Sequence, residues 1–353
     1  GEAGNLASRT GGCIAQVTNN HQRHKSKRHV TGRTVPMPNT AFLAPDLPGL
    51  KAAAAILRGG GLVAMPTETV YGLAADARND RAVAAIFDAK GRPRFNPLIV
   101  HLAELSQVEA LATLTPLAWR LAQVFWPGPL TLVLALRDDS LLSPLVTAGL
   151  PSVAIRLPGA DIARRLLTEF GGPVAAPSAN PSGRISPVTP AHVLAGLAGR
   201  IDAVIDGGPC AVGLESTIVD ATGDAPRLLR AGGLPAEALE AALGRPLLPA
   251  LHGTVTAPGQ LASHYAPRGR VHLNVTAPDP GDIWVGFGRC PGAELTLSDS
   301  GDLTEAAARL FHALHEADAL AGPGGRIAFA PVPEIGLGRA INDRLRRAAA
   351  PRG

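Results

Sequence analysis

The chain has 353 residues, of which 46% are hydrophobic and 18% are charged. This length is typical of two domains, and the composition excludes wholesale disorder. No apolar run is long enough to span a membrane, and residues 1–40 lack the apolar core of a signal peptide. Cys13, Cys210 and Cys290 form no disulfide framework. We therefore expect a cytoplasmic protein that does not bind membranes.

The positive net charge of +4 is concentrated at the start of the chain. Residues 1–40 contain six basic residues and one acidic residue, so the rest, with 27 basic and 28 acidic residues, is nearly neutral. We expect residues 1–44 to be a disordered basic extension. The run "HQRHKSKRH" is also compatible with a nucleic-acid-binding patch.

Periodicity, capping residues and glycine stops predict irregularly alternating helices and strands. In chain order they are a helix at 49–58, a strand at 62–66, a helix at 79–92, a strand at 98–102, helices at 104–112 and 116–126, strands at 130–136 and 152–158, a helix at 160–170 and a strand at 173–176. Further segments complete this unit near residue 245. The irregular alternation favours an α/β fold with a mixed twisted open sheet over a regular β-α-β repeat.

A Pro/Gly-rich segment at 246–269 separates this first domain (45–245) from a smaller α/β domain at 270–353. The second domain is predicted from the following elements: strands at 270–275, 282–288 and 293–298, a helix at 302–319, a strand at 325–332 and a helix at 336–350. Asp302 is the expected cap of the first of these helices. We interpret 246–269 as a linker that acts as a lid, with a passive tether as the alternative.

The common nucleotide, zinc and hydrolase motifs are absent from the sequence, and no pattern indicates a protein metal site. Instead, polar side chains follow or precede the predicted strands, where α/β proteins usually bind ligands. They are Thr67, Glu68, Thr69, Tyr71, Lys90, Arg92, Arg94, Asn96, His101, Arg156, Ser178, Asn180, Ser216, Thr217 and Arg230. Five of these are cations, which suits a polyanionic ligand such as a phosphate ester. Taken singly, Arg156 is compatible with a surface ion pair and His101 with a structural role.

One loop, "PVAAPSANPSGRISP" at 173–187, combines four prolines with serine, asparagine and arginine side chains. Proline excludes a helix here, and the segment is too long for a hairpin turn. Prolines restrict the free backbone, so little entropy is lost when such a loop binds a ligand.

Seven motifs occur in order: "PTETVYGL", "KGRPRFNPLIVHL", "WPGPLTLVL", "AIRLP", "APSAN", "ESTIVD" and "LLRAGG". Together they closely resemble the YrdC-like family, the threonylcarbamoyl-adenylate synthases. "SHYAP" and "GLGRAINDRLRRAA" resemble the linker and the end of the long form, which has a C-terminal Rossmann-like domain. The resemblance covers about residues 45–349 and implies a YrdC-like twisted open sheet with helices.

The resemblance also implies a reaction. L-threonine, bicarbonate and ATP yield threonylcarbamoyl-AMP, pyrophosphate and water, with Mg²⁺ accompanying ATP. This nucleotidyl transfer is the first step of the t6A modification of tRNA, and a downstream threonylcarbamoyl-transferase uses the product. A weak contact with tRNA is compatible with the basic extension.

The site residues implied by the resemblance fall into three groups. The family's Lys-x-Arg and Ser-x-Asn tetrad falls on Lys90, Arg92, Ser178 and Asn180. Contacts to L-threonine are implied at Thr69, His101, Arg156, Ala176 and Ser216. Contacts to ATP are implied at Lys90, Arg92, Asn96, Ser152, Ser178, Asn180, Ser186, Arg230 and Tyr265. The loop at 173–187 is then a nucleotide-binding loop, and Arg94 and Phe95 have no assigned role.

Two rival functions are compatible with parts of the sequence. A module that binds double-stranded RNA or tRNA would use the same basic groove, but RNA interfaces usually need a broad basic face and more aromatic residues than the 4% of this chain. A carbamoyl-transfer protein of the hydrogenase-maturation type would need cysteine-rich zinc motifs, which this sequence lacks.

Overall fold

The computed structural model describes residues 39–251, 257–258 and 264–351. These residues belong to one compact unit, 37–353. The expectation of a disordered extension falls mostly outside the described residues. Within them, Ala41–Leu43 form strand β1, so regular structure begins before residue 44.

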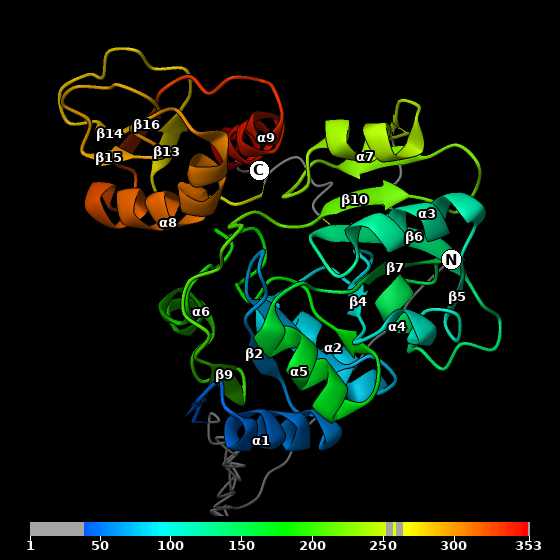
Figure 1. Cartoon of the computed structure of the whole chain (residues 1–353). Coiled ribbons are helices and arrows are strands. Elements are labelled where there is room, and N and C mark those ends of the chain that lie inside the picture. Colours follow the sequence, from blue (N-terminus) through cyan, green and yellow to red (C-terminus); the bar gives the residue numbers. More distant parts are fainter. Residues whose placement is uncertain (1–38, 252–256, 259–263, 352–353) are drawn as a thin grey trace, which may run out of the picture. The chain divides into compact units, whose positions relative to one another are not determined.

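A large mixed sheet carries most of the chain (Figure 1). Its strands, in spatial order, are β1 (Ala41–Leu43), β9 (Ala203–Ile205), β2 (Val63–Met65), β3 (Gly72–Asp76), β8 (Val174–Ala175), β4 (Ile99–His101), β7 (Ser152–Arg156), β6 (Leu130–Leu136), β10 (Thr217–Asp220), β11 (Arg227–Arg230) and β12 (Leu248–Pro249), with β5 (Ala112–Thr113) paired to β6. β4 and β7 are parallel, whereas β6 and β7 are antiparallel. The predicted mixed α/β sheet is therefore confirmed.

Helices cover both faces of this sheet. Successive strand residues point to opposite sides, and in the central strands both sides carry apolar residues that pack against helices. Val63 and Met65 of β2 pack in one cluster with α1 (Leu47–Arg58) and α5 (Asp161–Phe170). Ala64, between them, belongs to the core on the other face. Four further helices supply buried residues to that core: α2 (Asp80–Lys90), α3 (Pro116–Phe125), α6 (Pro190–Leu197) and α7 (Ala236–Leu243). A short helix, α4 (Pro144–Thr147), precedes β7.

A second sheet is entirely parallel, with the order β13 (Arg270–His272), β16 (Arg326–Phe329), β14 (Ile283–Gly286) and β15 (Leu295–Thr296). Two helices accompany it, α8 (Leu303–Ala321) and α9 (Leu337–Ala349). The Asp302 side chain caps α8 by accepting from the backbone N–H of Glu305, as predicted.

The structure also differs locally from the predicted elements. The helix expected at 104–112 is a single turn, Leu105–Gln107, followed by strand β5. The Gln107 side chain accepts from the backbone N–H of Ala103 and Glu104, and β5 then pairs with β6, so the segment ends in the sheet. Strand β3 was not expected, because its residues, "GLAAD", are small and do not alternate clearly.

Within the described part of the chain, no helix has the length and apolar character needed to cross a membrane.

Candidate active site

Most of the candidate residues meet in one pocket. Its cavity volume is about 50 Å³, smaller than the roughly 300–1,000 Å³ of typical small-molecule sites. The lining comprises Thr67, Thr69, Val70, Gly72, Arg92, Ile99, His101, Arg156, Ala176, Pro177, Ser178, Glu215, Ser216, Arg230, Pro258, His264 and Tyr265. Ile99 and His101 are two residues apart in β4, so both point to the same face of the sheet.

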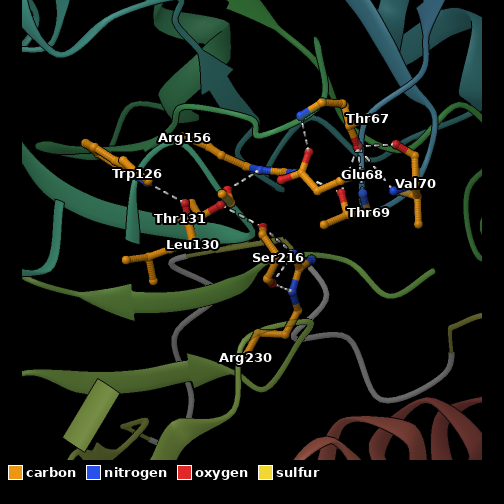
Figure 2. Close-up of polar contacts among 12 residues, drawn as sticks. Thr67, Glu68, Thr69, Val70, Trp126, Leu130, Thr131, Arg156, Ser216 and Arg230 are labelled. Carbon is orange, nitrogen blue, oxygen red and sulfur yellow. Dashed lines mark hydrogen bonds and ion pairs between the residues drawn. The ribbon is translucent and has the colours of Figure 1, made fainter. Parts of the chain in front are cut away.

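One end of the pocket is built on the buried ion pair between Arg156 and Glu68 (Figure 2). Arg156 lies at the end of β7, and its Nη2 donates to Glu68 Oε1 at 2.6 Å. Its Nη1 donates to Thr69 Oγ1 at 2.8 Å, and its Nε to the carbonyl oxygen of Gly128 at 3.3 Å. Burial alone would raise the pKa of Glu68. The charge and hydrogen bonds of Arg156 help to outweigh this effect, so the pKa lies below its ordinary value and the carboxylate is ionised.

The loop between β2 and β3 contains Thr67, whose hydroxyl makes hydrogen bonds within the loop. Thr67 Oγ1 donates to the carbonyl oxygen of Val70 at 2.6 Å and accepts from the N–H groups of Thr69 and Val70. It also lies 2.8 Å from Thr69 Oγ1. This local bonding helps to order the loop, in which Thr69 accepts a hydrogen bond from Arg156 (Figure 2).

A second polar chain joins β6, β10 and β11 (Figure 2). The hydroxyls of Thr131 and Ser216 are 2.7 Å apart. Arg230 Nη2 donates to the carbonyl oxygen of Ser216 at 2.8 Å and to its hydroxyl at 3.2 Å. Gly232 lets the loop after β11 approach this backbone, because a Cβ there would lie 2.3 Å from the carbonyl oxygen of Glu215.

The end of α2 supplies two further cations. Gly91 caps the helix with φ of 60°, a left-handed conformation that glycine adopts without strain, and it separates Lys90 from Arg92. Lys90 Nζ donates to the carbonyl oxygens of Ser178 and Asn180, each at 2.5 Å. Arg92 Nη2 donates to the carbonyl oxygen of Pro97 at 2.9 Å.

These cations are buried beside one another, which is costly without an anion. Lys90 is 3% exposed, Arg92 9% and Arg230 7%. Burial, reinforced by the charge of Arg92, holds the pKa of Lys90 well below its usual range. Burial and the charge of Arg230 lower the pKa of Arg92 to about 10. The region therefore favours a bound polyanion, which would restore these pKa values.

Two buried amide oxygens face no donor within the described residues: Asn96 Oδ1 and Asn180 Oδ1. The amide nitrogen of Asn180 is used, since it donates to the carbonyl oxygens of Pro181 and Arg184. Buried polar atoms in folded proteins nearly always have a partner. Both oxygens therefore lack the partner that such atoms usually have, although neither residue lines the pocket.

His101 is neutral across the physiological range. Burial, and then the charge of Arg156, lower the pKa of this imidazole to about 3. Its Nδ1 lies 3.3 Å from the carbonyl oxygen of Ile99, a contact that fits an Nδ1–H donor. The Nε2 atom would then be a hydrogen-bond acceptor.

The segment that precedes β13 contributes Pro258, His264 and Tyr265 to the lining. Tyr265 is 1% exposed, and its ring centroid lies 5.4 Å from that of Phe311 in α8 and 5.4 Å from the guanidinium carbon of Arg344 in α9. Burial outweighs the lowering by the charge of Arg344 and raises the pKa of the Tyr265 hydroxyl to about 12. The hydroxyl is therefore protonated at neutral pH.

The structure does not bring all candidates together. Lys90, Asn96 and Asn180 are absent from the lining, although Lys90 bonds to the loop that contains Ser178. Ser152 begins β7, whereas Arg156 ends it, so Ser152 lies at the opposite end of the strand from the pocket. Ser186 reaches the pocket only through Glu215, whose Oε1 accepts from the serine hydroxyl at 2.6 Å. Arg94 is exposed and lies 3.9 Å from Asp88, so four of the five expected cations are buried.

The sequence placed Glu68 among the strand-end candidates but indicated no role for Glu215, His264 or Arg344. Glu215 lies within the motif "ESTIVD" and His264 within "SHYAP", so the motifs could have identified both residues. Arg344 is on the last helix, and only the fold shows that its Nε donates to Glu215 Oε2 at 2.9 Å.

The described residues contain no group of three or more His, Cys, Asp or Glu side chains placed to hold a metal ion. The two carboxylates nearest the pocket, Glu68 and Glu215, are already engaged by arginines.

Two family models match the chain. The Sua5, YciO and YrdC model, described as telomere recombination, matches residues 55–232. The model for the C-terminal domain of threonylcarbamoyl-AMP synthase matches residues 234–350.

Similar proteins match over most of their lengths. A threonylcarbamoyl-AMP synthase from Bacillus subtilis is 41% identical, over 89% of this chain and 96% of its own length. One from Pyrococcus abyssi is 41% identical, over 85% of this chain and 94% of its own length. The crystal structure of P. abyssi Sua5 complexed with L-threonine superposes with a TM-score of 0.79 at 38% identity, covering 88% of this chain and 97% of that one.

Proposed function

Because the chain belongs to the Sua5 and YrdC family of threonylcarbamoyl-AMP synthases, we propose that its pocket joins L-threonine, bicarbonate and ATP into threonylcarbamoyl-AMP with release of pyrophosphate. The chain is thus an enzyme of the nucleotidyltransferase type. The observation that carries the proposal is that Arg156, Arg92 and Arg230 line one pocket, with Lys90 buried beside Arg92.

One group of pocket residues suits an amino acid. Arg156, Thr69 and Ser216 combine a guanidinium with two hydroxyls, a set that recognises a carboxylate and a small polar substrate. The neutral ring of His101 adds an acceptor suited to the threonine hydroxyl. Ile99 and Ala176 line the same pocket and offer apolar contact to the threonine methyl group. The complex of P. abyssi Sua5 with L-threonine supports the choice of this amino acid.

A second group suits the triphosphate of ATP. Lys90, Arg92 and Arg230 are buried cations, and the loop that contains Ser178 and Asn180 bonds directly to Lys90. The unpartnered oxygens of Asn96 and Asn180 would accept from the nucleotide's hydroxyl or amino groups. For Ser152 we propose no direct contact in this conformation, since it lies at the far end of β7.

Catalysis would rest on positioning and charge. The threonine amine attacks the bicarbonate carbon and, with loss of water, forms a carbamate. A carbamate oxygen then attacks the α-phosphorus of ATP, and the bond to the leaving pyrophosphate breaks. Neither step needs a nucleophile from the protein, but both need two anions held close together. We assign Lys90 and Arg92 to stabilising the charge on the phosphates, with Arg230 in support.

Mg²⁺ is expected to enter as part of the ATP complex. It prefers oxygen ligands and keeps several waters, and phosphates commonly supply much of its coordination. The engagement of Glu68 and Glu215 by arginines fits this arrangement, since the chain need only bind the phosphates that hold the ion.

The RNA-binding alternative is less well supported. Duplex RNA is recognised over a broad exposed surface. The cations of this pocket are nearly inaccessible, which suits a small enclosed polyanion instead. We propose that a downstream transferase, rather than this pocket, meets the tRNA.

The direct test is to identify the product. Incubation with ATP, Mg²⁺, L-threonine and ¹³C-labelled bicarbonate should yield a compound with the mass of threonylcarbamoyl-AMP that carries one ¹³C atom. A product without the label, or ADP in place of pyrophosphate, would contradict the proposed reaction.

A further inference from the structure

Arg344 of α9 is a fully buried arginine from the far end of the chain that contacts the walls of the pocket. It is 0% exposed, and its Nε donates to Glu215 Oε2 at 2.9 Å. Its Nη1 donates to the carbonyl oxygen of Ala231 at 2.7 Å and to Asp343 Oδ2 at 2.9 Å. A charged side chain is rarely buried so completely unless it is paired.

Apart from Asp343 on the same helix, the partners of Arg344 lie in or next to the lining of the pocket. Glu215 lines it and holds the Ser186 hydroxyl at 2.6 Å through its other oxygen. Ala231 follows Arg230, so the bond to its carbonyl oxygen fixes the chain directly after that cation. The guanidinium also lies over the ring of Tyr265. One side chain therefore connects three segments that are distant in sequence.

We propose that Arg344 is a positioning residue for nucleotide binding, which acts through the carboxylate of Glu215 and the ring of Tyr265. It would make the nucleotide end of the pocket dependent on the docking of α9. This inference rests on the proposed function, because it assumes that ATP is the ligand of the cation cluster.

The charge balance around Glu215 makes the role of Arg344 testable. The groups that interact electrostatically with this carboxylate are Arg344 from α9, Arg230 from β11, and His264 and Tyr265 from the segment before β13. Burial raises the pKa of Glu215, but the charges of Arg344 and Arg230 lower it below its ordinary value. Without Arg344, the buried carboxylate of Glu215 would lose the positive charge that stabilises its ionised form most, and its pKa would rise.

The test compares Arg344→Met, Glu215→Gln and the double variant with the wild type. We expect Arg344→Met to raise the Kd and KM for ATP at least tenfold at pH 8, and the KM for L-threonine less than threefold. The loss should shrink at pH 6, where more of the uncompensated Glu215 is protonated and no longer repels the triphosphate. Adding Glu215→Gln should restore ATP affinity to within threefold of Glu215→Gln alone and abolish the pH dependence.

The matched control is Arg346→Met, on the same helix, whose guanidinium pairs with Glu334 at an exposed position. It should leave both KM values unchanged. Arg344→Lys, which keeps the charge but loses the forked donors, should recover part of the affinity. If Arg344→Met does not fold, Arg344→Lys and Glu215→Gln, singly and combined, carry the same test.

An unchanged ATP Kd in folded Arg344→Met, or purely additive losses in the double variant, would overturn the role of Arg344. Calorimetric binding of ATP separates this result from the synthase proposal. A wild type that binds ATP without forming product would refute only the synthase reaction, and the variants would still report on Arg344. A wild type that does not bind ATP would refute both.

Discussion

The ammonium group of Lys90 donates to the carbonyl oxygen of Ser178 at 2.5 Å. This bond ties the C-terminal end of α2 to the loop after β8, so two motifs that are 88 residues apart in sequence form one unit. Lys90 therefore has two effects on the pocket. It supplies positive charge, and it holds the backbone of the loop that contains Ser178 and Asn180.

Replacing both Lys90 and Arg92 with alanine should abolish most of the activity. Loss of a single preorganised group that stabilises developing charge costs about 10²–10³-fold in kcat in well-studied enzymes, and this variant loses two cations. Pyrophosphate release is the measurement. Lys51→Ala, an exposed lysine on α1, is the control and should behave like the wild type. A double variant with wild-type pyrophosphate release would show that the phosphate assignment is wrong.

Removing Arg156 should destabilise the folded protein. Arg156→Met leaves the Glu68 carboxylate largely buried without its partner, a change that typically costs about 3–5 kcal/mol of unfolding free energy. Urea denaturation measures it, and adding Glu68→Gln should recover much of the loss. The exposed pair of Arg137 and Asp139 offers a comparison, and Arg137→Met should change stability little. An equally small loss for Arg156→Met would contradict the importance of the buried pair.

Stability should fall in acid because of His101. Its pKa is lowered to about 3 in the folded protein from an ordinary value of 6.5, so the unfolded chain binds the proton more readily. The stabilisation is present above pH 6.5 and is lost as the pH falls from 6.5 towards 3, by up to about 1.4 kcal/mol per pH unit.

The check for His101 is the slope of the unfolding free energy against pH. His101→Gln should flatten this slope by about one proton between roughly pH 6 and pH 4 relative to the wild type. Identical slopes for the two proteins would mean that His101 takes up a proton equally in the folded and unfolded states.

The ring of Tyr265 should matter more than its hydroxyl. The ring is buried against Phe311 and Arg344, and the high pKa keeps the hydroxyl protonated. Tyr265→Phe should therefore keep a near-wild-type KM for ATP, whereas Tyr265→Ala should raise it by about tenfold, the equivalent of one well-placed aromatic contact. Steady-state kinetics of the two variants measure these KM values. Equal KM values for Tyr265→Ala and the wild type would mean that the segment is a passive tether.

Discrimination between L-threonine and L-serine should be modest. The two substrates differ by one methyl group, which an apolar pocket recognises by about 10–200-fold in kcat/KM. Ile99 and Ala176 provide the apolar contact available in the lining. The comparison of kcat/KM for the two amino acids measures it, and a ratio near one would exclude a methyl pocket.

The sequence predicted the mixed sheet and most of the pocket, because the relevant side chains sit next to well-marked strands. His101 and Arg156 illustrate this, since each ends a short apolar run, and their strands pair in register. The wrong helix at 104–112 had a plausible helical pattern, but pairing of Ala112 and Thr113 with β6 overrode it. Such long-range pairing is invisible to local periodicity.

The position of Ser152 relative to the pocket and the contacts of Arg344 could be found only from the fold. Ser152 and Arg156 are four residues apart, yet an extended strand separates them, so proximity in sequence did not place both at the pocket. Arg344 lies 129 residues from Glu215, and a basic terminal helix gives no sign that one arginine of several is buried.

The central claim is tested most directly by pyrophosphate release from purified protein with ATP and Mg²⁺, in the presence and absence of L-threonine and bicarbonate. We predict release only when both are present, because the carbamate that attacks ATP needs both. Release that is independent of threonine, or no release under any of these conditions, would contradict the synthase function.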